Sequence, residues 1–291
     1  MRQYLFLAIA SACSTVAAQT PATNPMPDGS RDMFIGIGAQ SVPRYDGSSD
    51  NRTLAMPVLQ VQWSNGIFVS GTALGWHLSQ SPSMEFGPML ALSPRRDQGG
   101  VSFSFSGVSE GSSTRMAYTS LRPGEFSERE ELDPNRLRNM DVVKRRILAG
   151  GFFNYYLSPK LRLTNTLTYG SGKERNGARL HTSLQYMMVD VAPHHTVVLS
   201  AGVSVANRAY SETWFGVTEE EAERAGTRGY YRPGAGVQDV RAGVRWNWAL
   251  SPSWMLTSGA TVNRLAGDAK DSPLVERATN YSVSTALAYR F

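Results

Sequence analysis

Cysteine and histidine are scarce in this sequence. Cys13 is its single cysteine, and the 291 residues include four histidines. A disulfide needs two cysteines, and a structural zinc site usually takes four cysteine or histidine ligands. These absences exclude a disulfide framework and argue against a zinc centre. We expect neither a bound metal nor a cofactor.

Two further absences limit the class of protein. Beyond residue 18, no apolar run approaches the roughly 20 residues that a helix needs to cross a bilayer. The formal net charge of +5 is modest, and the basic residues are not gathered in blocks. Nucleic-acid binding usually requires such a concentrated basic patch. We therefore expect no helical membrane span and no nucleic-acid partner.

The first 18 residues have the pattern of a secretory signal peptide. Arg2 precedes the apolar run of residues 4–10, and small residues lead to a cleavage site after Ala18. A lipoprotein signal ending at Cys13 is the alternative, although the leucine usual three residues before such a cysteine is missing. Residues 19–30 are rich in Pro, Asn and Gly, and we expect a flexible lead-in there.

Apolar and polar residues alternate along most of the remaining chain. Tyr281, Val283 and Leu287 occupy one phase near its end, whereas Ser282 and Ser284 occupy the other. Successive side chains of a β-strand point to opposite faces, so such a segment has one apolar and one polar face. A soluble β-sandwich would satisfy the same pattern. Lipid is favoured because tryptophan and tyrosine stand at segment ends, where the aromatic girdles of a membrane barrel lie.

The breaks between these segments predict the fold. Short turns, such as 64–66 and 94–100, alternate with longer polar stretches, such as 78–82 and 208–234. Outer-membrane barrels have short periplasmic turns and longer extracellular loops in this way. We predict an all-β fold over residues 31–291: a closed antiparallel transmembrane β-barrel of about twelve strands, with ten as the alternative count, in a Gram-negative outer membrane. The expected strands are 31–41, 53–63, 66–77, 83–93, 99–107, 142–157, 159–170, 178–191, 194–207, 235–250, 253–264 and 279–291.

Several blocks of the sequence resemble the MltA-interacting protein (MipA/OmpV) family. The first are Phe-Ile-Gly-Ile-Gly at 34–38 and Val-Pro-Arg-Tyr-Asp-Gly-Ser-Ser at 42–49. Trp-Phe-Gly-Val-Thr follows at 214–218, and Arg-Leu-Ala-Gly-Asp-Ala begins the most recognisable block at 264–275. The final Tyr-Arg-Phe at 289–291 also fits. The blocks are spread over essentially the whole chain after the signal.

The resemblance implies a non-enzymatic outer-membrane barrel, because no catalytic residues belong to the family pattern. It implies a scaffold or adaptor that joins a lytic murein transglycosylase to a murein synthase. Outer-membrane lipid, lipopolysaccharide and the barrel assembly machinery are the other expected partners. The segment 96–141 departs from the family pattern, since it is longer and more charged. A narrow channel for small solutes, anions among them, is the alternative function, and an outer-membrane lipid hydrolase is less favoured.

Four arginines are the candidate residues of the barrel lumen. Arg162, Arg241, Arg245 and Arg290 share the polar phase of their segments. Burying an arginine without a partner is costly, so each should line water or pair with an acid such as Asp239. A barrel of twelve strands lies between the small, filled barrels and the open porins. The sequence is therefore compatible with an open interior and with a plugged one.

Four further residues have an expected role. Tyr289 and Phe291 end the last strand in its apolar phase, where we expect the insertion machinery to recognise the barrel. Arg44 and Tyr45 lie in a Pro-Arg-Tyr-Asp-Gly turn. The spacing of Pro, Asp and Gly is typical of loop architecture, and a binding role for the two side chains is the alternative.

Three other patterns have structural rather than catalytic interpretations. His181 and Ser183 share one strand face, as in the outer-membrane phospholipase, but no Asn-Gly follows Ser183, and two polar lumen residues are the expected case. Thr-Glu-Glu-Glu at 218–221 is a capping box, which predicts a short helix over 219–225 ended by Gly226. Gly36 and Gly38 mark close packing or a bend of the first strand rather than a phosphate loop.

Overall fold

The structure is a computed structural model that describes residues 31–79, 81, 83–102, 136–226 and 229–291. The side chains of Arg31 and Ser102 are not described. The predicted signal peptide and lead-in lie outside the described residues. No helix of the described chain is long and apolar enough to span a membrane.

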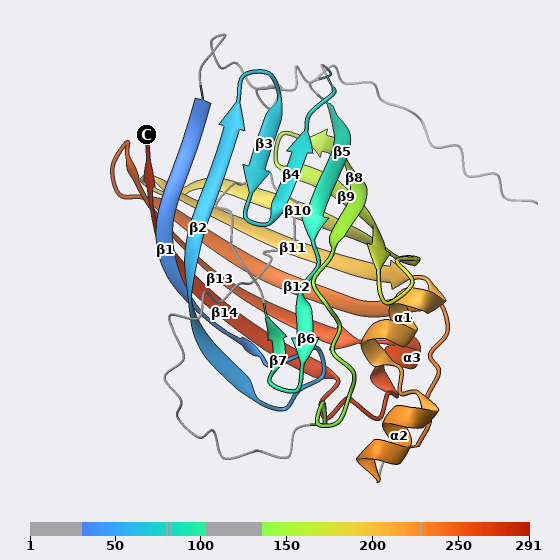
Figure 1. The fold of residues 1–291 in the computed structure, drawn as a ribbon. Coiled ribbons are helices and arrows are strands. Elements are labelled where there is room, and N and C mark those ends of the chain that lie inside the picture. The colour runs from blue at the N-terminus through green and yellow to red at the C-terminus, as the bar shows by residue number, and fades with distance from the viewer. Residues whose placement is uncertain (1–30, 80, 82, 103–135, 227–228) are drawn as a thin grey trace, which may run out of the picture.

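Twelve strands of the described chain form a closed, antiparallel barrel, which confirms the predicted fold class and strand count (Figure 1). Each strand pairs with its neighbours in the chain order of the barrel strands, and the first pairs with the last to close the wall. The barrel strands are β1 (Arg31–Pro43), β2 (Asn51–Trp63), β3 (Ile67–Ser70), β4 (Ala73–Trp76), β5 (Met84–Leu92), β8 (Ile147–Ser158), β9 (Leu161–Ser171), β10 (Gly177–Ala192), β11 (His195–Ala206), β12 (Gly236–Ala249), β13 (Trp254–Leu265) and β14 (Thr279–Arg290).

The wall has an apolar outer face. On β14, Tyr281 and Val283 are more than half exposed, whereas Ala286 and Ala288 on the opposite phase are buried in the interior. The same alternation exposes large apolar side chains on every barrel strand except β2. Exposing such an apolar face to water would be unfavourable, whereas the hydrocarbon of a lipid bilayer covers it.

Aromatic side chains are grouped near the barrel end at which β1 begins and β14 ends. His195 stacks on Trp246 and Trp248, with ring centroids 5.4 and 5.1 Å apart, and Trp254 contacts Tyr289 edge-on at 5.1 Å. These rings form part of a girdle at the membrane boundary. The turns at this end between β8 and β9 and between β10 and β11 contain only two residues each. We therefore assign this end to the periplasm.

Two of the predicted strand segments are wrong, although the total is right. The segment 66–77 is not one strand but the hairpin β3–β4, because Gly71 adopts a positive φ of 58° and turns the chain back halfway up the wall. The segment that begins at 99 contributes β7 (Gly100–Ser102), which pairs with β6 (Arg95–Asp97) in a separate two-stranded sheet. The hairpin adds one strand to the barrel and the segment 99–107 contributes none, so the count stays at twelve.

The same hairpin reverses two predicted connections. Because β3 and β4 replace one expected strand, the chain returns to the periplasmic end before β5. The stretch 78–82 is predicted as a long outer loop, but its described residues 78, 79 and 81 lie at the periplasmic end. The stretch 94–100, predicted as a short periplasmic turn, lies instead at the opposite end and belongs to β6 and β7.

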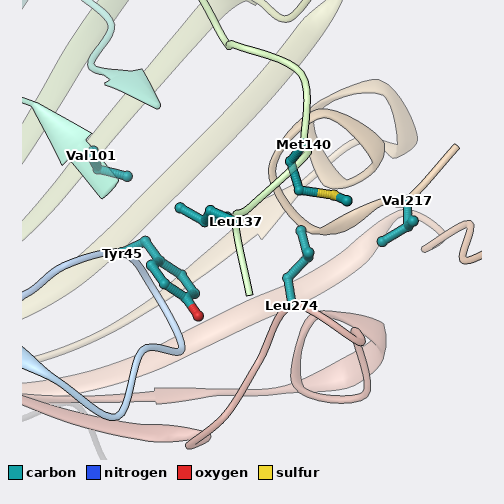
Figure 2. Close-up of a cluster of buried hydrophobic side chains, with 6 residues drawn as sticks. All are labelled: Tyr45, Val101, Leu137, Met140, Val217 and Leu274. Carbon is teal, nitrogen blue, oxygen red and sulfur yellow. The ribbon is translucent and has the colours of Figure 1, made fainter. Parts of the chain in front are cut away.

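The loops at the outer end fold together into a cap over the barrel. Figure 2 shows its core, in which six buried side chains from five separate segments face one another. These are Tyr45, Val101, Leu137, Met140, Val217 and Leu274. The helices α1 (Arg208–Phe215), α2 (Glu219–Ala225) and α3 (Gly267–Lys270) lie at this end (Figure 1). We call this assembly the cap.

The predicted helix over 219–225 is confirmed as α2. The Thr218 hydroxyl accepts from the Glu221 backbone N–H, the Glu221 carboxylate accepts from the Thr218 backbone N–H, and Gly226 ends the helix with a left-handed backbone. The helix is tied to the segment before β8 by Arg224, which pairs with Asp141 at 2.6 Å. Lys173 pairs with the same carboxylate at 2.5 Å. Hydrogen bonds from these two cations hold the pKa of Asp141 below its usual value.

Candidate functional site

Five polar side chains meet on the inner faces of β10, β11 and β12. In the strand register His181 lies opposite Ser204, and Ser204 lies opposite Asp239, so the three form one row across the sheet. Arg179 and Arg241 each stand two residues along their strands from this row and share its inward phase. We call these five residues the arginine–aspartate cluster.

The carboxylate of Asp239 holds the cluster together. Its Oδ2 lies 2.5 Å from Nη2 of Arg179, and its Oδ1 lies 2.7 Å from Nη2 of Arg241. The Ser204 hydroxyl donates to the same Oδ1 at 3.0 Å and accepts from Arg179 at 2.9 Å. Asp239 and Arg179 are almost fully buried. The cluster thus places two guanidinium groups around one carboxylate, and positive charge is in excess.

His181 completes the row without forming a catalytic triad. Its Nδ1 lies 3.1 Å from the Ser204 hydroxyl, which itself donates to Asp239. The order is therefore Asp–Ser–His, whereas a hydrolase triad needs the histidine between the other two, so that it can take the proton of the serine. The hydrogen-bond partner of His181 is thus Ser204 on the neighbouring strand rather than Ser183 on its own. We find no nucleophile–base arrangement in this row.

The cap closes over the cluster through α1 and the turn after β1. Asn207 caps α1 by accepting from the Tyr210 backbone N–H at 3.0 Å, and its Oδ1 also accepts from the Ala178 backbone N–H at 2.9 Å. These two hydrogen bonds hold the start of α1 so that the Tyr210 ring lies beside Arg179, whose guanidinium carbon is 5.6 Å from the ring centroid. Asp46 is partly buried within electrostatic reach of Arg179, and its desolvation raises its pKa.

A cavity of about 220 Å³ lies between the cluster and the cap. One part of its lining is polar and includes Arg179, His181, Arg241 and Asn263. The other part is apolar and comes chiefly from β1, β5, β8 and the cap. Its apolar side chains include Val42, Met89, Ala91, Leu92, Leu148, Val101 and Phe215. The interior therefore offers a site with one charged and one apolar side.

Two of the predicted lumen arginines face the interior, and each has a polar or charged side chain as its partner. Arg241 belongs to the cluster, and its partner Asp239 is the acid that the sequence suggested. Arg162 is buried lower in the barrel, where it donates to the Gln185 side chain at 2.5 Å and lies 5.6 Å from the Tyr156 ring centroid. Both side chains satisfy the requirement that a buried guanidinium have partners.

The other two predicted arginines lie nearer the periplasmic end. Arg245 lines a second, smaller cavity of about 70 Å³ in the middle of the barrel. Arg290 lies at the periplasmic mouth, where its side chain is 55% exposed and pairs with Asp32 at 2.7 Å. The four arginines are thus distributed along the interior rather than gathered at one point.

The predicted loop residues lie in the cap. The Tyr45 ring belongs to the cap core, and its hydroxyl donates to the Glu276 carboxylate at 2.7 Å. Burial raises the pKa of this hydroxyl. The Arg44 carbonyl accepts from the Val101 backbone N–H at 2.7 Å and so joins the β1–β2 turn to β7. The Tyr45 ring therefore packs within the cap, and a binding role for Arg44 and Tyr45 stays a prediction.

Comparison with known proteins identifies the family. Residues 35–291 match the family described as MltA-interacting protein MipA. The chain belongs to this family. It is 21% identical over 237 residues to the MltA-interacting protein of Escherichia coli, an alignment that covers 79% of this chain and 93% of that protein. It is also 30% identical over 91 residues to the outer membrane protein OmpV of Vibrio cholerae, which covers 31% of this chain and 34% of that protein.

The solved structures that align with this chain do so at low similarity. The outer membrane channel DcaP of Acinetobacter baumannii aligns with a TM-score of 0.39 at 7% identity, covering 90% of this chain and 96% of that chain. The NanC porin aligns with a TM-score of 0.37 at 7% identity, covering 90% and 100%. With its family and barrel fold established, this MipA-family protein is an outer-membrane protein.

The predicted assembly residues lie on the outer face at the periplasmic end. Tyr289 and Phe291 stack with ring centroids 5.9 Å apart, and the Phe291 backbone N–H donates to the Met33 carbonyl at 3.1 Å. Phe291 is 55% exposed, so its removal leaves no cavity in the interior. The position is therefore accessible to an external factor while the barrel closes.

Removing Phe291 should lower the amount of folded barrel in the outer membrane several-fold without lowering the stability of the barrel that does form. The ring makes few interior contacts, so its loss acts on insertion rather than on packing. Heat-modifiable mobility of the protein in membrane fractions measures both quantities. The control is Phe291→Tyr, which keeps an aromatic ring and should insert normally. Normal membrane levels of the truncated chain would refute an assembly role.

Sequence reasoning missed Arg179, the most buried cation of the cluster. The sequence pattern could have placed it in the interior. Its strand has a single polar phase that contains Arg179, His181, Ser183 and Gln185. The partners could not be inferred, since they depend on the register between β10, β11 and β12. The turn pattern also gives no sign that Asp46 is a partly buried acid beside the cluster.

Proposed function

We propose that this protein is an adaptor: an outer-membrane barrel with a filled interior that binds a lytic murein transglycosylase at its periplasmic end. The support from comparison is the name of its relative in Escherichia coli, the MltA-interacting protein. A murein synthase is the second partner that we propose, so that bond cleavage and synthesis in the cell wall are held at one place.

The observation that carries the proposal is the packing of the barrel interior. Between β1, β2 and β14, the buried side chains of Met56, Val58, Ala286 and Ala288 form an apolar cluster against which Phe34 and Met255 pack. The arginine–aspartate cluster and the cap occupy the outer half. Apart from the cavities of about 220 and 70 Å³, packed side chains and ion pairs occupy the described interior. Such packing suits a protein that acts through its surface rather than one that conducts solutes.

Site-specific photocrosslinking from the periplasmic end tests the adaptor proposal. A photoreactive amino acid at Asn65, Lys160 or Ser253 places the reactive group in the short turns. Matched controls at Glu174 and Glu220 place it in the outer loops. We expect a lytic transglycosylase, identified by mass spectrometry, to be captured from the first set alone. Equal capture from both sets, or from neither, would contradict the proposal.

A narrow conduit for small solutes is the second candidate, and one observation favours it. The cavity beside the cluster and the smaller cavity beside Arg245 share two lining residues, Thr261 and Ser282. Arg241 and Arg245 stand four residues apart on β12, which spaces them by about 13 Å along the strand. A continuous polar path between them would favour anions.

A further inference from the structure

The barrel wall has an unpaired stretch beside the upper cavity. The β3–β4 hairpin pairs with β2 only at residues 60–62, and Gly71 makes the last backbone contact by donating to the Leu59 carbonyl. Within the described residues, residues 51–58 of β2 therefore have no strand neighbour on that side. Figure 1 shows the hairpin ending partway along β2, where its tip is level with the end of β5.

Leu92 links this unpaired stretch to the cavity. It ends β5 in the outward phase, pairs with Ile147, and is 40% exposed on the outer face. Leu92 nevertheless lines the inner cavity, together with Thr72 at the tip of the hairpin. Within the described residues, the cavity therefore reaches the wall at the end of β5, beside the tip of the β3–β4 hairpin. Ile147 and Leu90 beside Leu92 are exposed and apolar, so this part of the wall lies at the height of the lipid.

The polar side of the cavity carries an excess of positive charge. Four arginines line it (Arg96, Arg145, Arg179 and Arg241), together with one carboxylate, that of Asp46. Asp239 behind the lining pairs with Arg179 and Arg241, so the guanidinium groups still outnumber the carboxylates. An anionic group complements such a lining best, because it forms charge-assisted hydrogen bonds with guanidinium groups.

We propose that this cavity binds a small amphipathic anion, a carboxylate or phosphate group attached to an apolar body, which enters from the bilayer past Leu92. The anionic group lies against Arg179 and Arg241, and the apolar body lies against Met89, Leu148 and Leu92. The site does not depend on a periplasmic partner, so it stands apart from the adaptor role.

Binding is tested with 11-(dansylamino)undecanoic acid, a fluorescent amphipathic anion, and the full protein in phosphatidylcholine nanodiscs. We expect saturable, one-to-one fluorescence enhancement. Arg241→Gln should raise the Kd at least about tenfold, since it removes a charge-assisted contact while Asp239 keeps Arg179 as its partner. The matched control is Arg245→Gln, four residues along the same strand face and outside this cavity, which should bind as the wild type does.

The apolar side of the site is tested separately. Ala91→Trp should fill the cavity and abolish saturable binding while heat-modifiable mobility shows a folded barrel. The methyl ester of the same probe should bind at least about tenfold more weakly, because it lacks the charge. Equal binding of acid and ester, or equal effects of the Arg241 and Arg245 variants, would overturn the proposal.

The route of entry distinguishes a bilayer ligand from a free anion. Leu92→Trp should slow the uptake of probe from vesicles, whereas Leu90→Trp, two residues earlier on the same outer face, should not. Inorganic phosphate at millimolar concentration should fail to displace the probe, because it has no apolar body. Displacement by phosphate, or uptake unaffected by Leu92→Trp, would show that the site takes anions from solution and would overturn entry from the bilayer.

Discussion

Replacing Asp239 with asparagine should lower the free energy of unfolding by about 3–5 kcal/mol. The change removes the charge shared by two guanidinium groups, one of them almost fully buried, while the shape of the side chain is kept. Arg179 and Arg241 then repel one another within the barrel. Urea unfolding followed by loss of heat-modifiable mobility, in the same detergent for all variants, measures the effect.

The matched control is another acid–arginine pair in the same barrel. Asp32 and Arg290 also lie 2.7 Å apart, but at the periplasmic mouth, where their side chains are 30% and 55% exposed. Asp32→Asn should cost at most about 1 kcal/mol, as exposed ion pairs do. A similar small cost for Asp239→Asn would mean that the cluster is hydrated and that the interior around it is open to water.

Replacing Gly36 with valine should prevent most chains from forming a closed barrel. A Cβ atom at this position would stand 2.2 Å from the Leu287 carbonyl oxygen and 2.7 Å from Cα of Ala288. Both belong to β14, whose pairing with β1 closes the wall. Overpacking in a well-packed site costs about 1–3 kcal/mol, and here the clash is with backbone that cannot give way. The folded fraction in membranes is the readout.

Ile37 provides the control for this closure. It is the next residue of β1, it points outward and it is 75% exposed to the lipid side. Ile37→Val should assemble as well as the wild type, because lipid fills the missing volume. Normal assembly of Gly36→Val would show that β1 and β14 lie farther apart at this position than they do in the structure.

The barrel class, its strand count and its capped helix could be predicted because each depends on local pattern. Alternation fixes which side chains of a strand face lipid, and a capping box fixes where α2 begins. The same is true of Gly36 and Gly38, whose close approach to β14 confirms the expected close packing. Arg241 could be placed in the interior by phase alone.

The β3–β4 hairpin could not be predicted, since its residues alternate as one long strand would and only Gly71 marks the turn. The cavity could not be predicted either. It depends on the register that sets Ser204 against Asp239 and on loops that fold back from opposite sides of the barrel. Contacts between residues far apart in the sequence, such as Tyr45 with Glu276, leave no local signal.

Planar-bilayer conductance of the purified protein tests most directly whether the interior is filled. We expect no steady conductance from the wild type. The double variant Arg241→Glu and Arg245→Glu should remain silent and unfold more easily, because the first change places a second acid beside Asp239. Steady, ion-selective conductance in the wild type, with selectivity that reverses in the double variant, would contradict the filled interior and establish the conduit instead.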